Sequence, residues 1–353
     1  MKVDCGALHA NPRAFAGIAS EMETRGYDGV WCPETRHDLA ASLALAAVGT
    51  DHVELGTSVL LAFARTPMTV AITANDLQEL SGGRFVLGLG TQIQPHITRR
   101  FSMPWSQPAA RMREYVLALR AIWHSWATGD DLNFAGDFYT HTYLPPFFSP
   151  GPNPFGNPPV HLAAVGPRLT EVAGEVADGV LLHAFTTRRY LTDVTLPALH
   201  RGFARGGRDG DGFEIGCPTL VATGRTPDEV ARATRAVRRQ IAFYGSTPAY
   251  APVLQLHGWG EVGVELNRLS KEGRWTDMAD AVPDEVVHEI AVVASSEDLG
   301  PAIERRLAGI ADRVLFYLLD EQPIECFEPA RRRLQHANLS RRTVSASLAG
   351  AVN

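Results

Sequence analysis

Short, β-branched apolar runs alternate with longer helical patterns almost from the first residue, and this alternation limits the possible folds more than any other feature of the chain. Each run is followed by a helix-like segment; the eight runs cover residues 3–8, 27–32, 52–59, 84–90, 160–165, 179–183, 214–222 and 313–319. Strands that alternate with helices are typical of parallel sheets. Eight such units predict an α/β protein, a closed (β/α)8 TIM barrel with insertions.

A doubly wound open sheet is the alternative fold. Its dinucleotide fingerprint would follow an early strand, whereas the first strand here runs into LHANPRAF, which lacks G-x-G-x-x-G. The barrel is therefore favoured. We expect residues 1–353 to form a single barrel domain, with insertions near 130–159 and 244–282.

Composition limits the partners and the compartment. Hydrophobic residues make up 45% of the chain and charged residues 20%, which is enough apolar surface for a large core. The formal net charge of −6 does not favour a nucleic-acid partner, and no apolar run approaches the roughly 18 residues of a membrane span. The N-terminus lacks the apolar region of a signal peptide, and the four cysteines form no CxxC pair. We expect a cytoplasmic protein with reduced, buried thiols, no metal site, and no binding to nucleic acid or membrane.

Three segments interrupt the repeat. Residues 139–159 are rich in proline and aromatics and follow a helix predicted over 111–128, so we expect a stiff arm under the barrel. Residues 91–105 follow the fourth strand and are expected to overhang the catalytic face, because loops after strands build that face of a barrel. The sequence leaves open on which face residues 244–282 lie.

The end of the second strand carries three titratable residues in GYDGVWCPETRHDLAAS. Asp38 is expected to cap the helix predicted over residues 39–48. Glu34, at the end of the strand, is expected to meet the ligand, with His37 as a candidate proton donor or acceptor. Both could instead be solvated loop residues.

Small residues end the next three strands. Thr57 and Ser58 follow the third strand, and Gly90 and Thr91 close the fourth, where a flat ligand could approach the backbone. After the fifth strand, Gly166 and Pro167 begin a helix whose N–H groups could bind an anion. Close packing of strands and helices would explain each of these glycines equally well.

Four separated segments carry a resemblance to a known family. They are GYDGVWCPETRHD, ELGTSVLLAFARTPMTVA, LSGGRFVLGLGTQ with HITRRFSMPW, and AAVGPRLTEVAGEVADGVLLH. In this order they resemble the bacterial luciferase-like superfamily, and within it the branch of coenzyme F420-dependent oxidoreductases. The resemblance implies a TIM barrel that holds a flavin-type ring over its C-terminal mouth, often in a homodimer.

The resemblance also implies site residues. Glu34 matches an acidic residue near the ring, and Ser58-Val59 matches a bulge that commonly contains a non-prolyl cis peptide. A second set matches contacts to the ring and its tail, and comprises Thr91, Gln92, His96, Val165 and Gly166. The sugar-phosphate dehydrogenases of this branch place a histidine directly after the acidic residue and a glutamate after the fourth strand. Here Thr35 and Arg36 precede His37, and Ile93 replaces the glutamate.

The function implied by the resemblance is hydride transfer between the deazaflavin F420 and a small organic substrate with a C=C, C=N or alcohol/carbonyl group. Glu34 is the leading candidate for the acid near the substrate, and His37 is the second. The alternative is a reduced-FMN monooxygenase of the same superfamily. A non-catalytic barrel is a third possibility, for which the sequence offers no positive feature.

Overall fold

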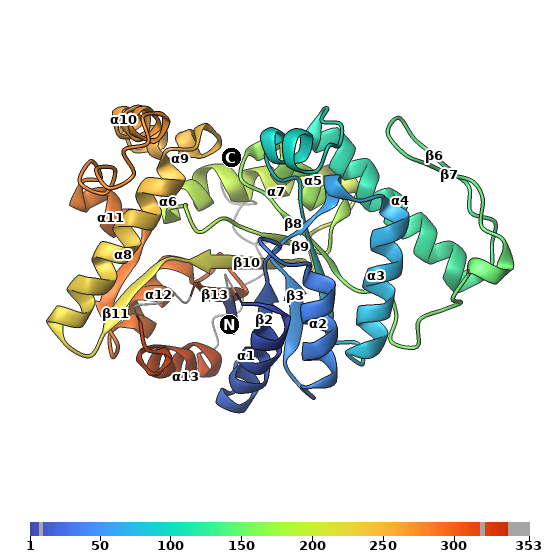
Figure 1. Ribbon diagram of the computed structural model, residues 1–353, viewed down its shortest axis with the longest axis horizontal. Helices are drawn as coiled ribbons and strands as arrows, with labels where there is room; N and C mark the ends of the chain where they lie inside the picture. Colours follow the sequence, from blue (N-terminus) through green and yellow to red (C-terminus); the bar gives the residue numbers. More distant parts are fainter. Residues whose placement is uncertain (7–9, 318–321, 338–353) are drawn as a thin grey trace, which may run out of the picture.

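The computed structural model describes residues 1–6, 10–317 and 322–337 (Figure 1). Eight parallel strands form the barrel, and the pairing of β3 with β5 closes it. In barrel order the strands are β1 (Lys2–Gly6), β2 (Gly29–Cys32), β3 (Glu54–Thr57), β5 (Phe85–Gly90), β8 (Val160–Ala163), β9 (Gly179–Leu181), β10 (Glu214–Thr219) and β13 (Arg313–Tyr317). A short strand, β4 (Leu60–Leu61), also pairs with β5. The predicted TIM barrel is confirmed; the predicted ends of the first and last strands, residues 7–8 and 318–319, lie outside the described residues.

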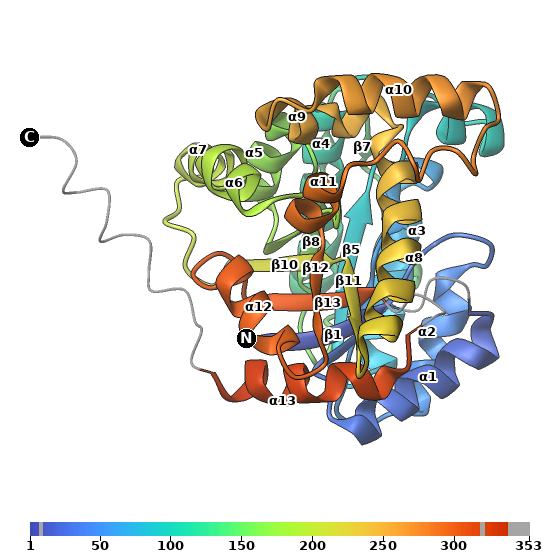
Figure 2. The ribbon, with the colours of Figure 1, turned by 90° about the vertical axis from the view of Figure 1, so that its left-hand side faces the viewer.

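Helices surround the barrel (Figures 1 and 2). They include α1 (Pro12–Arg25), α2 (Leu39–Val48), α3 (Pro67–Leu80), α4 (Pro108–Thr128), α5 (Pro167–Val176), α7 (Leu196–Gly206), α12 (Leu299–Leu307) and α13 (Glu328–His336). The start of α2 is fixed by a capping residue. The Asp38 carboxylate accepts a hydrogen bond from the Ala40 N–H at 2.8 Å, which confirms the predicted cap.

The predicted seventh strand is divided. β10 ends at Thr219, and Val221–Gly224 forms a separate strand, β11, which pairs with β12 (Val292–Ser295) outside the barrel. Between β11 and β12 the chain forms α8 (Pro227–Gly245), α9 (Ala251–Leu256), α10 (Gly260–Lys271) and α11 (Asp284–Ile290), which pack on a second hydrophobic cluster that they share with residues 184–190. The predicted insertion near residues 244–282 falls within this part of the chain, and α9 and α10 lie at the end toward which β5 and β8 run (Figure 2).

The aromatic arm, residues 139–159, reaches the underside of the barrel, as predicted: Phe155 lies against Gly83, in the turn that precedes β5. The arm begins in the second strand of a hairpin, β6 (Phe134–Ala135) and β7 (Thr140–His141), which lies beside α4 (Figure 1). The Glu114 carboxylate accepts hydrogen bonds from three backbone N–H groups of the hairpin, at 2.6 to 2.8 Å. Arg111 donates to the Tyr139 hydroxyl at 2.7 Å, so the first half of α4 holds the hairpin.

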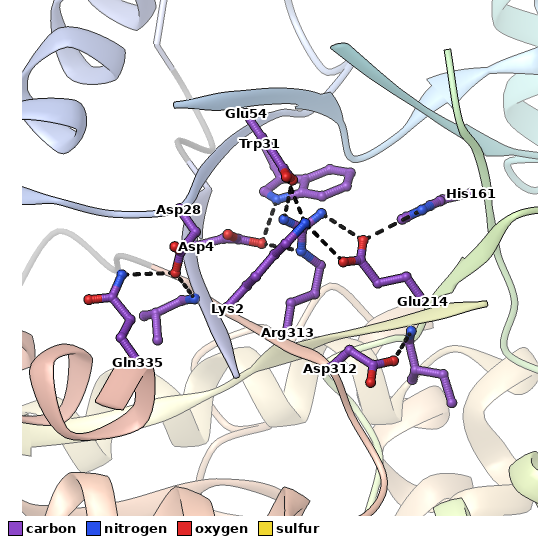
Figure 3. A network of polar contacts seen from close by, with 12 residues as sticks. Lys2, Asp4, Asp28, Trp31, Glu54, His161, Glu214, Asp312, Arg313 and Gln335 are labelled. Atoms are coloured by element: carbon purple, nitrogen blue, oxygen red, sulfur yellow. Dashed lines mark hydrogen bonds and ion pairs between the residues drawn. The ribbon is translucent and has the colours of Figure 1, made fainter. Parts of the chain in front are cut away.

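A buried charge network fills the barrel at the N-terminal ends of its strands (Figure 3). Arg313 is fully buried, and its guanidinium pairs with Asp4 at 2.8 Å, Glu214 at 3.0 Å and Glu54 at 2.5 Å. Burial raises the pKa of Asp4 to about 6, although Arg313 and a hydrogen bond from Trp31 act to lower it. Charged side chains therefore fill the N-terminal end of the barrel. A ligand could bind at the opposite end, where the strands have their C-terminal ends.

All four cysteines are buried and unpaired, as the sequence predicts. Among the described residues, the structure contains no helix with the length and apolar character needed to cross a membrane.

Candidate active site

A cavity of about 940 Å³ opens where the barrel strands end. Val59, Gly90, Ala163 and His183, each at or within two residues of the end of a barrel strand, line it. Further lining comes from the loop after β5, the starts of α4 and α5, and the insertion. Residues 91–94 and Trp105 belong to the loop after β5, so the prediction that this loop overhangs the catalytic face is confirmed.

The chain after β3 forms one wall of this cavity. The Ser58-Val59 peptide bond is cis, as the resemblance implies. The Val59 side chain lies against Gly90, where an added Cβ would come within 2.4 Å of Val59 Cγ2. Ser58 instead lines a much smaller pocket together with Trp31 and Leu315.

The Thr57 side chain holds two strands together and is not among the described residues that line the cavity. It is fully buried, and its hydroxyl donates to the Gly88 carbonyl at 2.6 Å and accepts from the Gly88 N–H at 2.8 Å. Both functions of the hydroxyl are therefore used in joining β3 to β5.

Glu34 is paired with Arg65 instead of facing the cavity directly. The two side chains form an ion pair with contacts of 2.7 and 2.9 Å, and Glu34 also accepts the Leu61 N–H at 2.9 Å. The Glu34 side chain is 7% exposed. Glu34 reaches the cavity through Leu61, which lines it.

The two histidines predicted for the site lie outside it. His37 and His96 are exposed, and neither is among the described residues that line the cavity. His96 begins the π-helical turn His96–Arg100, from which Arg100 donates to the Thr35 carbonyl at 2.7 Å. This contact links the loop after β5 to the loop after β2.

The start of α5 offers the clearest place for an anionic group. Val165, Gly166 and Pro167 line the cavity, as predicted. Among the described residues, no side chain caps α5, and an added Cβ on Gly166 would meet nothing within 4 Å. The backbone N–H groups of the first turn are therefore open to a ligand, and they favour a phosphate or carboxylate.

The sequence reasoning missed His183 and Tyr250, which both line the cavity. Their rings stack, with centroids 4.3 Å apart and an interplanar angle of 19°. Burial lowers the pKa of His183 to about 4. His183 ended a predicted strand, which is a signal for the catalytic face, but nothing in the sequence places Tyr250 beside it.

These features define a (β/α)8 barrel that can hold a large, partly flat ligand with an anionic group at its C-terminal mouth. Residues 2–312 match the model of the luciferase-like monooxygenase family, and the chain belongs to this family.

Known proteins resemble the chain over most of its length. An uncharacterised protein of Mycobacterium tuberculosis is 52% identical over 89% of this chain and 92% of its own. A 5,10-methylenetetrahydromethanopterin reductase of Archaeoglobus fulgidus is 27% identical over 78% of this chain and 81% of its own. The solved structure of a coenzyme F420-dependent tetrahydromethanopterin reductase from Methanopyrus kandleri superposes with a TM-score of 0.78, at 19% identity, over 95% of this chain and 98% of that one.

Proposed function

We propose that the protein is an F420-dependent oxidoreductase that moves a hydride between the bound deazaflavin and a small organic substrate. One observation carries the proposal: the same cavity joins an apolar wall at Val59 and Gly90 to the open start of α5 at Gly166. A ring with a phosphate-bearing tail has matching chemistry. A putative coenzyme F420-dependent oxidoreductase of Mycobacterium tuberculosis, 31% identical over 80% of this chain and 84% of its own, supports the choice of F420, as does the reductase structure from Methanopyrus kandleri.

The residues of the chain would hold the cofactor and the substrate as follows. Val59, Leu61 and Trp105 give the ring an apolar surface and exclude water from the reacting face. Thr91 and Gln92 offer polar contacts at the rim, and the first turn of α5 binds the phosphate of the tail. When bound, the deazaflavin supplies or accepts the hydride.

We assign Glu34 as a positioning residue. Its carboxylate fixes the Leu61 backbone and the Arg65 guanidinium, and Leu61 forms part of the cavity wall next to Val59. A role of Glu34 or His37 in carrying the proton remains the competing hypothesis.

A cofactor titration tests the proposal. The apoprotein is expected to bind oxidised F420 at least about tenfold more tightly than FMN, a difference of about 1.4 kcal/mol. The measurement follows ring fluorescence as each cofactor is titrated with protein. Equal or tighter binding of FMN, with oxygen consumption after reduction, would assign the protein to the reduced-FMN monooxygenases of its family.

Replacement of Gly166 by valine is expected to weaken F420 binding roughly tenfold or more with little change in stability. The added side chain enters open cavity, so nothing in the fold must move, but it covers the N–H groups at the start of α5. Fluorescence titration and thermal unfolding measure the two effects.

Gly88→Val is the matched control for this experiment. A Cβ at Gly88 would lie 1.9 Å from the Thr57 carbonyl oxygen, so this variant is expected to lose stability. If Gly166→Val lowers the melting temperature as Gly88→Val does and leaves the F420 affinity of the folded protein unchanged, Gly166 is a packing glycine.

We also propose that the protein forms a homodimer. Four large apolar side chains are exposed on the neighbouring helices α2 and α3: Leu45, Val48, Ile72 and Leu80. Exposed apolar surface of this kind is typical of protein interfaces.

A further inference from the structure

His183 is held in one orientation and one tautomer at the edge of the cavity. The Phe185 backbone N–H donates to His183 Nδ1 at 3.0 Å. Because Nδ1 accepts a hydrogen bond, the proton of the neutral ring lies on Nε2. The imidazole therefore offers one N–H donor that its own loop does not use.

The insertion fixes the position of this ring. Tyr250, in the short helical turn Pro248–Tyr250, stacks on the imidazole, and Tyr244 near the end of α8 contacts it edge-on at 4.6 Å between centroids. Phe185 lies beside Tyr250, with centroids 5.8 Å apart. Aromatic contacts from two places in the insertion thus restrict rotation of the imidazole.

The donor lies at the end of a barrel strand, where the neighbouring strand ends are apolar. His183 is partly exposed and lines the cavity, and the other strand-end residues there, Val59, Gly90 and Ala163, have no polar side chain. Over the described part of the chain, Nδ1 is the only atom of the His183 ring with a hydrogen-bond partner in the protein. A ligand in contact with these strand ends would meet the fixed His183 donor, and Thr91, Gln92 and Tyr250 add polar groups elsewhere in the lining.

We propose that His183 Nε2–H donates a hydrogen bond to the substrate, and that the substrates are neutral carbonyl or imine compounds whose acceptor atom adjoins the carbon that takes the hydride. The position of the reacting carbon rests on the proposed function. The choice of an acceptor atom rests on His183 alone, because a fixed donor at an apolar wall favours a ligand that can accept its hydrogen bond.

The protonation state of His183 agrees with this role. Burial lowers the pKa of the imidazole to about 4, so the ring is neutral at physiological pH. A neutral imidazole can polarise a carbonyl by hydrogen bonding without giving up its proton. His183 would thus orient and polarise the substrate while keeping its own proton, and the proton that completes the reduction at the acceptor atom would come from solvent water at the mouth of the cavity.

Two ligands of similar shape test the proposal in the full-length protein: cyclohexanone, which has an acceptor oxygen, and methylenecyclohexane, which has none. Titrations are followed by proton–nitrogen NMR of protein labelled with ¹⁵N-histidine, with and without oxidised F420. The unaltered protein is expected to show the Nε2–H tautomer for His183 and to bind cyclohexanone roughly 3- to 10-fold more tightly, the contribution of one neutral hydrogen bond. Only cyclohexanone should shift the Nε2 signal.

His183→Phe keeps an aromatic ring for stacking and removes the donor. Competition with a fluorescent apolar probe gives the two dissociation constants. Their ratio is expected to fall to about 1 in this variant, while its affinity for F420 changes by less than about threefold. His183→Gln retains an N–H donor and is expected to keep part of the ratio. His124→Phe, the same substitution at an exposed position on α4, is the control and should leave the ratio unchanged.

Equal affinities for the two ligands, or no detectable binding of either, in the unaltered protein would overturn the proposal. A ratio that persists in His183→Phe would do the same. If the ratio behaves as expected in the protein without cofactor while F420 fails to bind, the proposed function is wrong and the assignment of His183 as a donor stands.

Discussion

Arg313→Met is expected to lower the free energy of unfolding by about 3–5 kcal/mol, the usual cost of removing one partner from a buried ion pair. Arg313 is fully buried and balances the carboxylates of Asp4, Glu54 and Glu214 (Figure 3). Lys2 contacts Glu54 and Glu214 as well, at 2.6 and 3.1 Å, but among the described residues it forms no ion pair with Asp4. The variant would therefore leave the buried Asp4 without its cation.

Urea unfolding at pH 7, followed by circular dichroism, measures this loss. Arg268→Met is the matched control: Arg268 also pairs with two carboxylates, Glu265 and Glu272, but all three side chains are exposed. Exposed pairs contribute at most about 1 kcal/mol. A loss in Arg313→Met no larger than that of the control would contradict a stabilising role for the network.

The deficit of Arg313→Met should shrink as the pH falls. Burial already raises the pKa of Asp4 to about 6, against an ordinary value of 3.8, and removing Arg313 removes the main influence that lowers it. A carboxyl whose pKa is higher in the folded than in the unfolded protein favours folding increasingly as the pH falls from its folded pKa to its unfolded pKa. The difference from the unaltered protein is therefore expected to be smaller at pH 5 than at pH 7.

The barrel was predictable because its signals are local. Strands buried on both faces appear as short apolar runs, and residues 160–165 and 179–183 contain β8 and β9. The cap of α2 needs only Asp38 and the N–H two residues further on. The cavity residues Gly166 and Pro167 follow from the same logic, because a loop after a barrel strand lies at the catalytic face.

The parts that were not predictable depend on contacts between distant residues. Arg313 and Glu54 are 259 positions apart, and no periodic pattern relates their strands. Tyr250 reaches His183 because the insertion folds over the mouth of the barrel, a placement set by the packing of α8, α9 and α10. The surroundings of Glu34 were missed for the same reason, since Arg65 reaches it from another strand-to-helix loop.

Glu34→Gln is expected to lower the turnover of reduced F420 roughly 100-fold, the size of effect that a displacement of about 1 Å in an active site can cause. The Glu34 carboxylate accepts hydrogen bonds from Arg65 through both oxygens and from the Leu61 N–H. The glutamine amide has only one oxygen, so its NH2 group would face either the Arg65 guanidinium or the Leu61 N–H, which are both donors. The Leu61 wall and Arg65 should shift together, while F420 binding stays within about tenfold, because most of the cavity is unaltered.

Turnover is measured from the absorbance of F420 with the fastest substrate in a panel of ketones, imines and alkenes, over a range of pH. If Glu34 is a positioning residue, Arg65→Met reproduces most of the loss, because it breaks the same ion pair, and the pH profile of Glu34→Gln keeps its shape. Loss of one limb of the profile in Glu34→Gln, with Arg65→Met still active, would instead identify Glu34 as the proton carrier.

His37→Asn is expected to retain turnover, because His37 is exposed and lies outside the described lining of the cavity. If His37→Asn abolishes turnover and Glu34→Gln retains it, the proton is carried by His37, and the loop after β2 must close over the cavity during the reaction.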